Sequence, residues 1–447
     1  MSPDTLAAEE RSRSAPTARA QAHLRRAPGP RAQWFCLVTR CTQIRRTKEL
    51  PHGLLGMVGL VIAIECAVSH FGSIDICRSH LALSWRKSCQ SVTDPEAKAD
   101  ILCFGDSLVK LGVLPRVIED SLGLSAYNLA VLAGQPASSF FLFRQVLESG
   151  HRPRAVIVDF SASLLTMSLR SNLEGWAELA NWRDAIELAL DAGDPALGIG
   201  IASRWLVPSR SSQALLRPAL AVGQERGPTG GAVEDRRVFE RNWCQNRGAQ
   251  AAPRQFVPIV GALPAPPKEG EYKWRPRPVH AAYVARFLSL ARSHAIPVFW
   301  VLPPVVATRR ERLESSGIVA AYDAFVLSFA TAYSGVTILD GTSLEWDTRA
   351  FRDPIHLNRD GAVAFSLAIA RTLARRLGQA NEAGLPRWVC LDAPLEISDH
   401  AWERLLEDLD ESRGALDRRG RVATSKEELK WSRMPSAIPR KAGPGGT

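Results

Sequence analysis

The chain has 447 residues, 46% of them hydrophobic and 23% charged, a composition typical of a globular protein with one large or two ordinary domains. Its net charge of +10 suggests a nucleic-acid partner, but residues 1–50 alone hold ten Lys and Arg against four acids. Because this basic tail precedes an apolar segment, the charge favours membrane topology, and we predict no nucleic-acid partner.

The tail, residues 1–50, is rich in Ala, Arg, Ser and Pro, and we expect it to be disordered. The apolar run Leu54–Val68 follows it. With its flanks, as residues 51–71, the run reaches about the 20 residues of a spanning helix, although Glu65 interrupts it. Arginines before the run predict a single-pass anchor with the following domain outside the cytoplasm. A signal peptide and a buried core helix are the alternatives.

Residues 72–98 are expected to form a membrane-proximal linker or a first helix, with Trp85 as an anchor. The eight cysteines lack the Cys-x-x-Cys and Cys/His spacings of zinc sites, so we predict no metal and no cofactor. Cys77 and Cys89 are close enough in sequence to form a disulfide in an exported domain.

Four apolar residues, Ile101–Phe104, lead directly into Gly105-Asp106-Ser107. A short apolar run that ends at a glycine turn is typical of a buried parallel strand. Ligands bind open α/β sheets just past the carboxyl ends of such strands, so Ser107 is a candidate nucleophile. The alternative is an ordinary turn between a strand and a helix.

Further apolar runs and helical periods alternate along the chain. Five strands separated by helices predict a parallel sheet that is covered on both faces. The other four strands are expected at residues 125–131, 155–160, 297–302 and 336–339, and helices at residues 115–122, 136–148, 318–332 and 361–377.

Residues 164–278 interrupt this alternation as an insertion. Residues 173–216 have helical periods with three tryptophans, and we expect them to pack over or beside the active site. Residues 222–278 are rich in Gly, Pro, Arg and Glu, which predicts an irregular return segment. A tolerated surface insertion is the alternative. Residues 381–447 form a polar C-terminal extension that is partly disordered, with a charged helix near residues 401–419.

Asp353 and His356 stand three residues apart, just before the last predicted helix. A serine hydroxyl needs a base to remove its proton, and histidine oriented by a carboxylate is the usual base. Asn358 can cap the helix that follows. The alternative is a surface pair of ordinary polar residues near a helix start.

The order of strand, Gly-Asp-Ser, alternating strands and helices, and Asp-x-x-His before a last helix resembles the SGNH (GDSL-type) hydrolase family. The resemblance implies a flavodoxin-like three-layer α/β core, made of residues 99–163 and 279–380 with about five parallel strands. It also implies a catalytic triad of Ser107 as nucleophile, His356 as base and Asp353 as its partner.

The resemblance also implies an oxyanion and substrate site. Gly134 fits the glycine of the family's second block, and Asp106 belongs to the first. The family's asparagine is missing from the third block, where Ser163 stands at about its position. Ser161, Ser163 or a residue from elsewhere substitutes for it, or activity is low, because losing one oxyanion donor costs a few kcal/mol.

The leading hypothesis is a membrane-anchored serine esterase that acts on acyl esters. The missing asparagine and the sequence His-Leu-Asn-x-x-Gly-Ala that begins at His356 are similar to the membrane-anchored envelope branch of the family, which handles acyl groups on polysaccharides. The expected substrate is therefore an acyl ester or an acylated glycan. The alternatives are an O-acyltransferase of envelope polysaccharide and a non-catalytic binding protein with the same fold. The sequence sets no oligomeric state.

Overall fold

The computed structural model describes residues 52–71, 79–207, 229–257, 273–377, 386–392 and 406–418. The chain divides into two compact units, Met1–Ile64 and Glu65–Thr447. The second unit contains the sheet and every residue of the predicted site.

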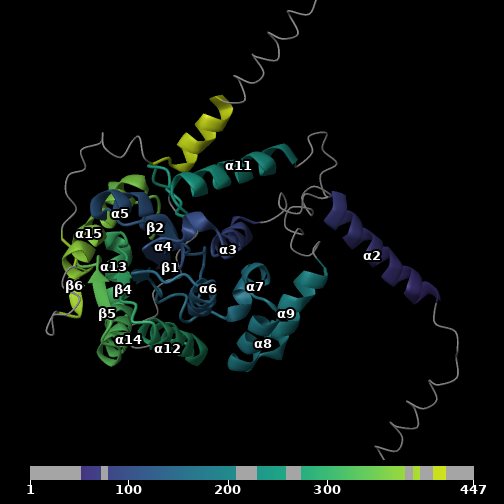
Figure 1. Cartoon of the computed structure of the whole chain (residues 1–447), viewed down its shortest axis with the longest axis horizontal. Coiled ribbons are helices and arrows are strands. Elements are labelled where there is room, and N and C mark those ends of the chain that lie inside the picture. Colours follow the sequence, from purple (N-terminus) through teal and green to yellow (C-terminus); the bar gives the residue numbers. More distant parts are fainter. Residues whose placement is uncertain are drawn as a thin grey trace, which may run out of the picture. The chain divides into compact units, whose positions relative to one another are not determined.

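Six parallel strands form one sheet in the order β2-β1-β3-β4-β5-β6 (Figure 1). This confirms the predicted α/β class and the alternation of strands with helices. The strands are β1 (Ile101–Phe104), β2 (Ala126–Asn128), β3 (Ala155–Val158), β4 (Val298–Leu302), β5 (Val336–Asp340) and β6 (Trp388–Cys390).

Each central strand sends alternate side chains to opposite faces of the sheet, as a pleated strand must. In β1, Leu102 and Phe104 join one hydrophobic cluster, whereas Ile101 and Cys103 join the other. The first cluster includes residues of α6 (Pro136–Glu148), α12 (Pro278–Ser293) and α14 (Ile318–Ala332), and the second includes residues of α5 (Pro115–Leu122) and α15 (Arg359–Leu377) (Figure 1). Both faces are therefore covered by helices.

Local sequence signals set several of these boundaries. Pro115 and Pro136 occupy the first turns of α5 and α6, where a missing N–H costs no intrahelical bond. Gly123 ends α5 in the left-handed conformation, with φ 65°. The bounds of α5, α6 and α14 agree with the prediction.

The other helices are α2 (His52–Phe71), α3 (His80–Ser91), η3 (Pro95–Ala97), α4 (Ser107–Gly112), η4 (Leu169–Asn172), α7 (Leu173–Leu179), α8 (Trp182–Asp191), α9 (Pro195–Leu206), α11 (Thr229–Gln245), α13 (Ala307–Ser315) and η6 (Thr348–Ala350).

The prediction of an irregular second part of the insertion is wrong, because this part contains α11, whose Trp243 and Phe239 are buried. The C-terminal extension supplies β6, a sixth strand beside β5 that the sequence did not predict. Residues 409–418 of the extension are helical with Ser412 buried, within the range of the charged helix expected there. Neither segment has a long apolar period, and both are held by tertiary contacts.

The predicted anchor segment, residues 51–71, forms the helix α2. Among the described residues, no single helix has the length and apolar composition of a membrane span, and only the bent pair of α13 and α14, at 83°, meets the criterion jointly. The following segment is helix α3, with Trp85 buried in the core. The Cys89 thiol lies 3.7 Å from the Gln145 side-chain oxygen, while Cys77 and residues 1–50 lie outside the described residues.

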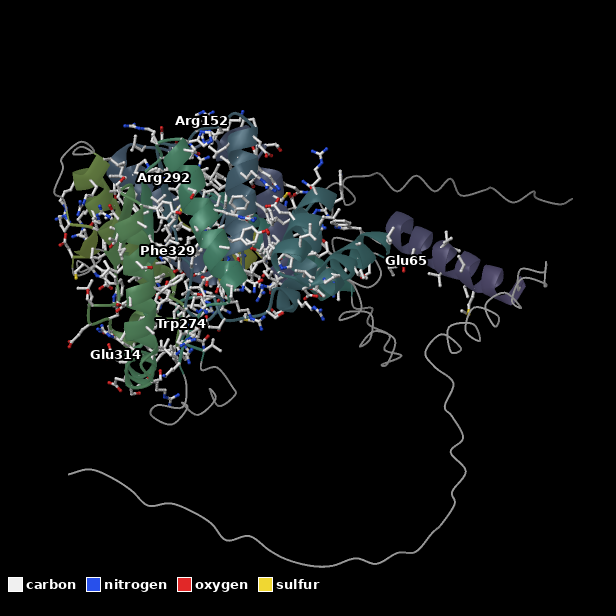
Figure 2. The ribbon with its side chains drawn as sticks, turned by 90° about the horizontal axis from the view of Figure 1, so that it is seen from below. Glu65, Arg152, Trp274, Arg292, Glu314 and Phe329 are labelled. Atoms are coloured by element: carbon white, nitrogen blue, oxygen red, sulfur yellow. The ribbon has the colours of Figure 1, made fainter. Side chains whose placement is uncertain are left out.

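The chain rejoins the sheet just before α12. The Trp274 indole N–H donates to the Ala162 carbonyl at 3.0 Å, and the Arg277 N–H donates to the Leu165 carbonyl. Figure 2 labels Trp274 and Phe329, which both belong to the aromatic side chains gathered around α14. These contacts return the insertion's end to the carboxyl edge of β3, where the insertion also began.

Candidate active site

Ser107, His356 and Asp353 form one chain of hydrogen bonds, although 249 residues separate the serine from the histidine. The His356 Nε2 lies 2.9 Å from the Ser107 Oγ, and its Nδ1 lies 2.8 Å from the Asp353 Oδ2. A carboxylate only accepts hydrogen bonds, so Nδ1 carries the proton and Nε2 is left to accept from the serine hydroxyl. This is the proton order that a general base requires.

The Asp353–His356 turn is organised around the aspartate side chain. The Asp353 Oδ1 accepts the N–H groups of Ile355 and His356, at 3.0 and 2.9 Å. Burial opposes the charge of Asp353, but the hydrogen bonds and the charge of His356 outweigh it and lower the pKa of the carboxyl. Asp353 is therefore held ionised, ready to orient the imidazole. Asn358 caps α15 as predicted, since its Oδ1 accepts the Gly361 N–H.

The turn that carries Ser107 requires its glycine. Gly105 has φ 133°, and a Cβ there would stand 3.0 Å from the Asp159 carbonyl oxygen. Asp106 then caps α4, with its Oδ1 accepting the Leu108 N–H at 2.7 Å. The Asp106 side chain is buried, and its hydrogen bond from the Leu108 N–H holds the turn in place. Burial raises the pKa of Asp106, while the hydrogen bonds from Ser161 and Leu108 act in the opposite direction.

Sequence reasoning missed Asp159, which follows β3 directly. Its carboxyl is buried, and its Oδ2 has no hydrogen-bond partner. Burial, followed by the charge of Asp106, raises the pKa of Asp159 well above its usual range. An acid at the end of the apolar run Ala155–Val158 was the available signal. The structure thus has two buried carboxyl groups beneath the turn that bears Ser107.

The predicted oxyanion residues differ in their hydrogen-bond partners and in their exposure to solvent. Gly134 lies against this turn, because a Cβ there would stand 2.4 Å from the Gly105 carbonyl oxygen, but its N–H donates to the Val131 carbonyl at 3.0 Å. The Ser161 hydroxyl donates to the Asp106 Oδ2 at 2.5 Å. Ser163 is exposed, and its Oγ lies 3.5 Å from the Ser161 Oγ. Ser161, not Ser163, is the hydroxyl linked to the turn that carries Ser107.

The insertion's second part contacts both elements of the triad. On the serine side, the Gln250 N–H donates to the Lys110 carbonyl of α4 at 3.0 Å. On the histidine side, the Ala252 carbonyl accepts the Arg359 N–H at 2.9 Å, and the Val257 N–H donates to the Arg352 carbonyl. We call residues 248–257 the brace. The brace joins the helix that bears Ser107 to the turn that bears His356.

A fully buried lysine connects the brace to α4. The Lys110 Nζ donates to the Gly248 carbonyl at 2.7 Å and lies 3.7 Å from the centre of the Trp243 ring. Burial lowers the pKa of Lys110 well below its usual value. Gly248 itself has φ 83°, and a Cβ there would stand 2.3 Å from the Asn128 carbonyl oxygen. The sequence gives no sign of this contact, because its acceptors are backbone carbonyls.

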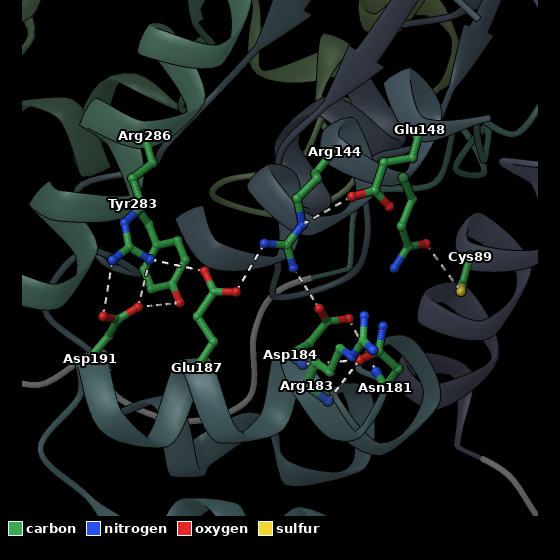
Figure 3. Close-up of polar contacts among 11 residues, drawn as sticks. Cys89, Arg144, Glu148, Asn181, Arg183, Asp184, Glu187, Asp191, Tyr283 and Arg286 are labelled. Carbon is green, nitrogen blue, oxygen red and sulfur yellow. Dashed lines mark hydrogen bonds and ion pairs between the residues drawn. The ribbon is translucent and has the colours of Figure 1, made fainter. Parts of the chain in front are cut away.

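The insertion's first part is anchored elsewhere, by ion pairs from α8 to α6 and α12 (Figure 3). Arg144 of α6 reaches Asp184 at 2.5 Å and Glu187 at 2.9 Å. Arg286 of α12 reaches Glu187 at 3.0 Å and Asp191 at 2.6 Å. The expectation that α7–α9 lie beside the active site has partial support at their base, where the Asn172 side chain donates to the Ala133 carbonyl next to Gly134.

Among the residues that the structure describes, no three His, Cys, Asp or Glu side chains are grouped as a metal ion would require. No family model matches the chain, and no curated protein matches it. The geometry of the site therefore carries the functional argument alone.

Proposed function

We propose that the chain is a serine esterase of the SGNH type, built on a flavodoxin-like core. The single observation that carries the proposal is the hydrogen-bonded series Ser107–His356–Asp353 at 2.9 and 2.8 Å. Three residue types in this order have one well-understood use, which is to generate a serine nucleophile for acyl transfer.

The positions of the protons on Ser107 and His356 determine the steps of the proposed ester hydrolysis. The Ser107 Oγ attacks the ester carbonyl carbon while its proton moves to the His356 Nε2, and ionised Asp353 stabilises the imidazolium. The tetrahedral intermediate expels the alcohol, which takes that proton, and leaves an acyl-serine. Water then attacks with His356 as base and releases the acid. A sugar hydroxyl in place of water would give the acyltransferase, so product analysis with a glycan acceptor separates these outcomes.

The oxyanion of the tetrahedral intermediate needs hydrogen-bond donors close to Ser107. The Ser107 N–H begins α4 and has no carbonyl partner within the helix. Gly134 and Ser161 both donate elsewhere, and this observation favours the alternative of a non-catalytic binding protein. A substrate oxygen can still recruit either donor by replacing its present acceptor, because catalytic hydrogen bonds often tighten only when substrate is bound.

Membrane anchoring and export are a further part of the proposal, supported by the apolar run in α2 and by the arginines before it. The side chains of Met57, Leu60 and Ile62 in α2 are more than half exposed, at 64%, 61% and 57%. The envelope location would bring the domain to acylated glycans, the substrate class that the resemblance implies.

A fluorophosphonate probe tests these proposals together. The wild-type chain should be labelled covalently and should hydrolyse a short activated ester, whereas Ser107→Ala should lose labelling and at least about a thousandfold in rate. Ser121→Ala is a matched control, because the Ser121 hydroxyl only donates to the Val117 carbonyl in α5. A membrane-impermeant probe should label intact cells if the domain is exported. An unlabelled wild-type chain would refute the esterase, and labelling only after lysis would refute export.

A further inference from the structure

Two helices of the insertion expose large apolar side chains. On α8, Trp182, Ile186 and Leu190 are 61%, 53% and 75% exposed. They are spaced by four residues and therefore form one stripe. On α9, Ile199 and Leu206 are 69% and 78% exposed and lie seven residues, or two turns, apart. We call these five side chains the α8–α9 apolar face.

An ordinary surface helix turns its apolar stripe to the core and its charged side chains to water. The helix α8 has the opposite arrangement. All three acids of α8 instead face arginines of α6 and α12, and the Tyr283 hydroxyl also donates to Asp191 at 2.8 Å (Figure 3). The charged side of the helix is bound to the protein, and the stripe of Trp182, Ile186 and Leu190 is left outward.

The two helices present their outward residues on one packed unit. Gly198 of α9 faces Ala189 of α8 so closely that a Cβ on the glycine would stand 3.2 Å from the alanine Cβ. The Trp205 indole N–H donates to the Ala177 carbonyl of α7, which ties the end of α9 to the same unit. The exposure is therefore a property of a folded surface.

The charged residue beside Trp182 is basic. The Arg183 guanidinium lies 5.1 Å from the centre of the Trp182 ring, and both residues are exposed. The acids of α8 are neutralised by arginines on the protein side, as described above. Apolar residues with tryptophan on one side and arginine at the edge are typical of helices that lie in the plane of a membrane interface.

We propose that the α8–α9 apolar face lies in the headgroup boundary of an anionic phospholipid bilayer. The acyl boundary takes up Ile186, Leu190, Ile199 and Leu206, and Trp182 and Arg183 occupy the headgroup level. A protein partner would have to match both the apolar stripe and the basic edge, whereas an anionic bilayer supplies both everywhere along its surface. This surface contact needs no spanning helix and no catalytic activity.

The test uses the full chain with vesicles of phosphatidylcholine and phosphatidylglycerol whose acyl chains carry bromine, a short-range quencher of tryptophan. Wild-type emission should be quenched, and Trp182→Phe should lower the quenched share about twofold, because Trp182 and Trp205 are the exposed tryptophans of this unit. Trp388→Phe on β6 is the matched control and should leave quenching unchanged. Quenching rather than binding is measured, since the membrane anchor proposed for α2 would hold the chain to a vesicle without this face.

Two further variants test whether the apolar stripe of α8 contacts the acyl chains. Ile186→Glu and Leu190→Glu stand on exposed positions, so the fold is retained, and each should lower quenching further. Removing phosphatidylglycerol or raising salt should weaken it, because the edge is basic. Equal quenching in wild type and Trp182→Phe overturns the proposal. A dimer in solution that Ile186→Glu dissociates, without any lipid quenching, also overturns it and assigns the face to a second copy.

Discussion

The two parts of the insertion are held to the rest of the molecule by different kinds of contact. The first part, with the regular helices α7–α9, is bound by side-chain ion pairs to α6 and α12. The second part, expected to be an irregular return, contains α11 and the brace, which hydrogen-bonds α4 and also Arg352 and Arg359 on either side of the Asp353–His356 turn. A helical period predicts that a helix forms, but it does not say where the helix docks. The backbone contacts of the brace hold the elements of the candidate site without leaving a sequence pattern.

Gly248→Ala should have the largest effect, because the substitution breaks the brace where it meets the sheet. The new Cβ would stand 2.3 Å from the Asn128 carbonyl oxygen, at a residue with φ 83°. Backbone strain and overpacking together should lower the free energy of unfolding by roughly 2–5 kcal/mol. Fluorophosphonate labelling of Ser107 should fall as well, and urea unfolding with labelling rates measures both.

Gly193→Ala in the first part is the matched control for this change. Gly193 also has a positive φ, 59°, but its Cβ would meet open space. The variant should cost only about 1–2 kcal/mol of backbone strain and leave Ser107 labelling unchanged. If the two alanine variants behave alike in labelling, the brace has no special connection to the triad.

The elements that the sequence predicts are those with local sequence signals, and the elements that it misses are held by contacts with distant residues. Helices α5, α6 and α14 were predictable because proline starts and apolar periods are local signals. The meeting of Ser107, Asp353 and His356 was predictable because the Gly-Asp-Ser and Asp-x-x-His motifs that contain them resemble those of a known family. Strand β6 is only three residues long, and α11 is polar and begins with glycines, so neither has a usable period. Asp159 was missed because its importance comes from burial, which a sequence does not display.

Lys110→Met should change the pH dependence of stability. Burial lowers the pKa of Lys110 in the native state, whereas the unfolded lysine keeps its usual value of about 10.4. Between the two values the unfolded chain binds one more proton, so this residue makes stability rise with pH by up to about 1.4 kcal/mol per unit. The slope of the unfolding free energy against pH, measured from pH 7 to 9.5, should therefore decrease in the variant.

The exposed Lys98→Met is the control for that slope and should leave it as in the wild type. Cys103 acts in the opposite direction in the same range, because burial raises the pKa of its thiol to about 12. The contribution of Lys110 is therefore the difference in this slope between the Lys110→Met variant and the wild type. An unchanged slope in Lys110→Met would mean that the native lysine is charged, bound as a cation to the Gly248 carbonyl and the Trp243 ring.

Arg144→Leu addresses the first part of the insertion and should have a smaller effect than Gly248→Ala. The Asp184 side chain is only 3% exposed, so removing Arg144 leaves a buried carboxylate without its cation. Because Arg144 itself is 26% exposed, solvent moderates the loss to about 1–3 kcal/mol of unfolding free energy. Arg349→Leu, which removes an exposed pair with Asp347, should have a smaller effect on the unfolding free energy, because solvent screens exposed ion pairs. Ser107 labelling should be unchanged in both variants, because α8 is held to the outer helices and not to the triad. A loss of labelling in Arg144→Leu would instead mean that strain at α6 reaches the Gly134 turn through the start of that helix, and the two parts of the insertion would then act on the site together.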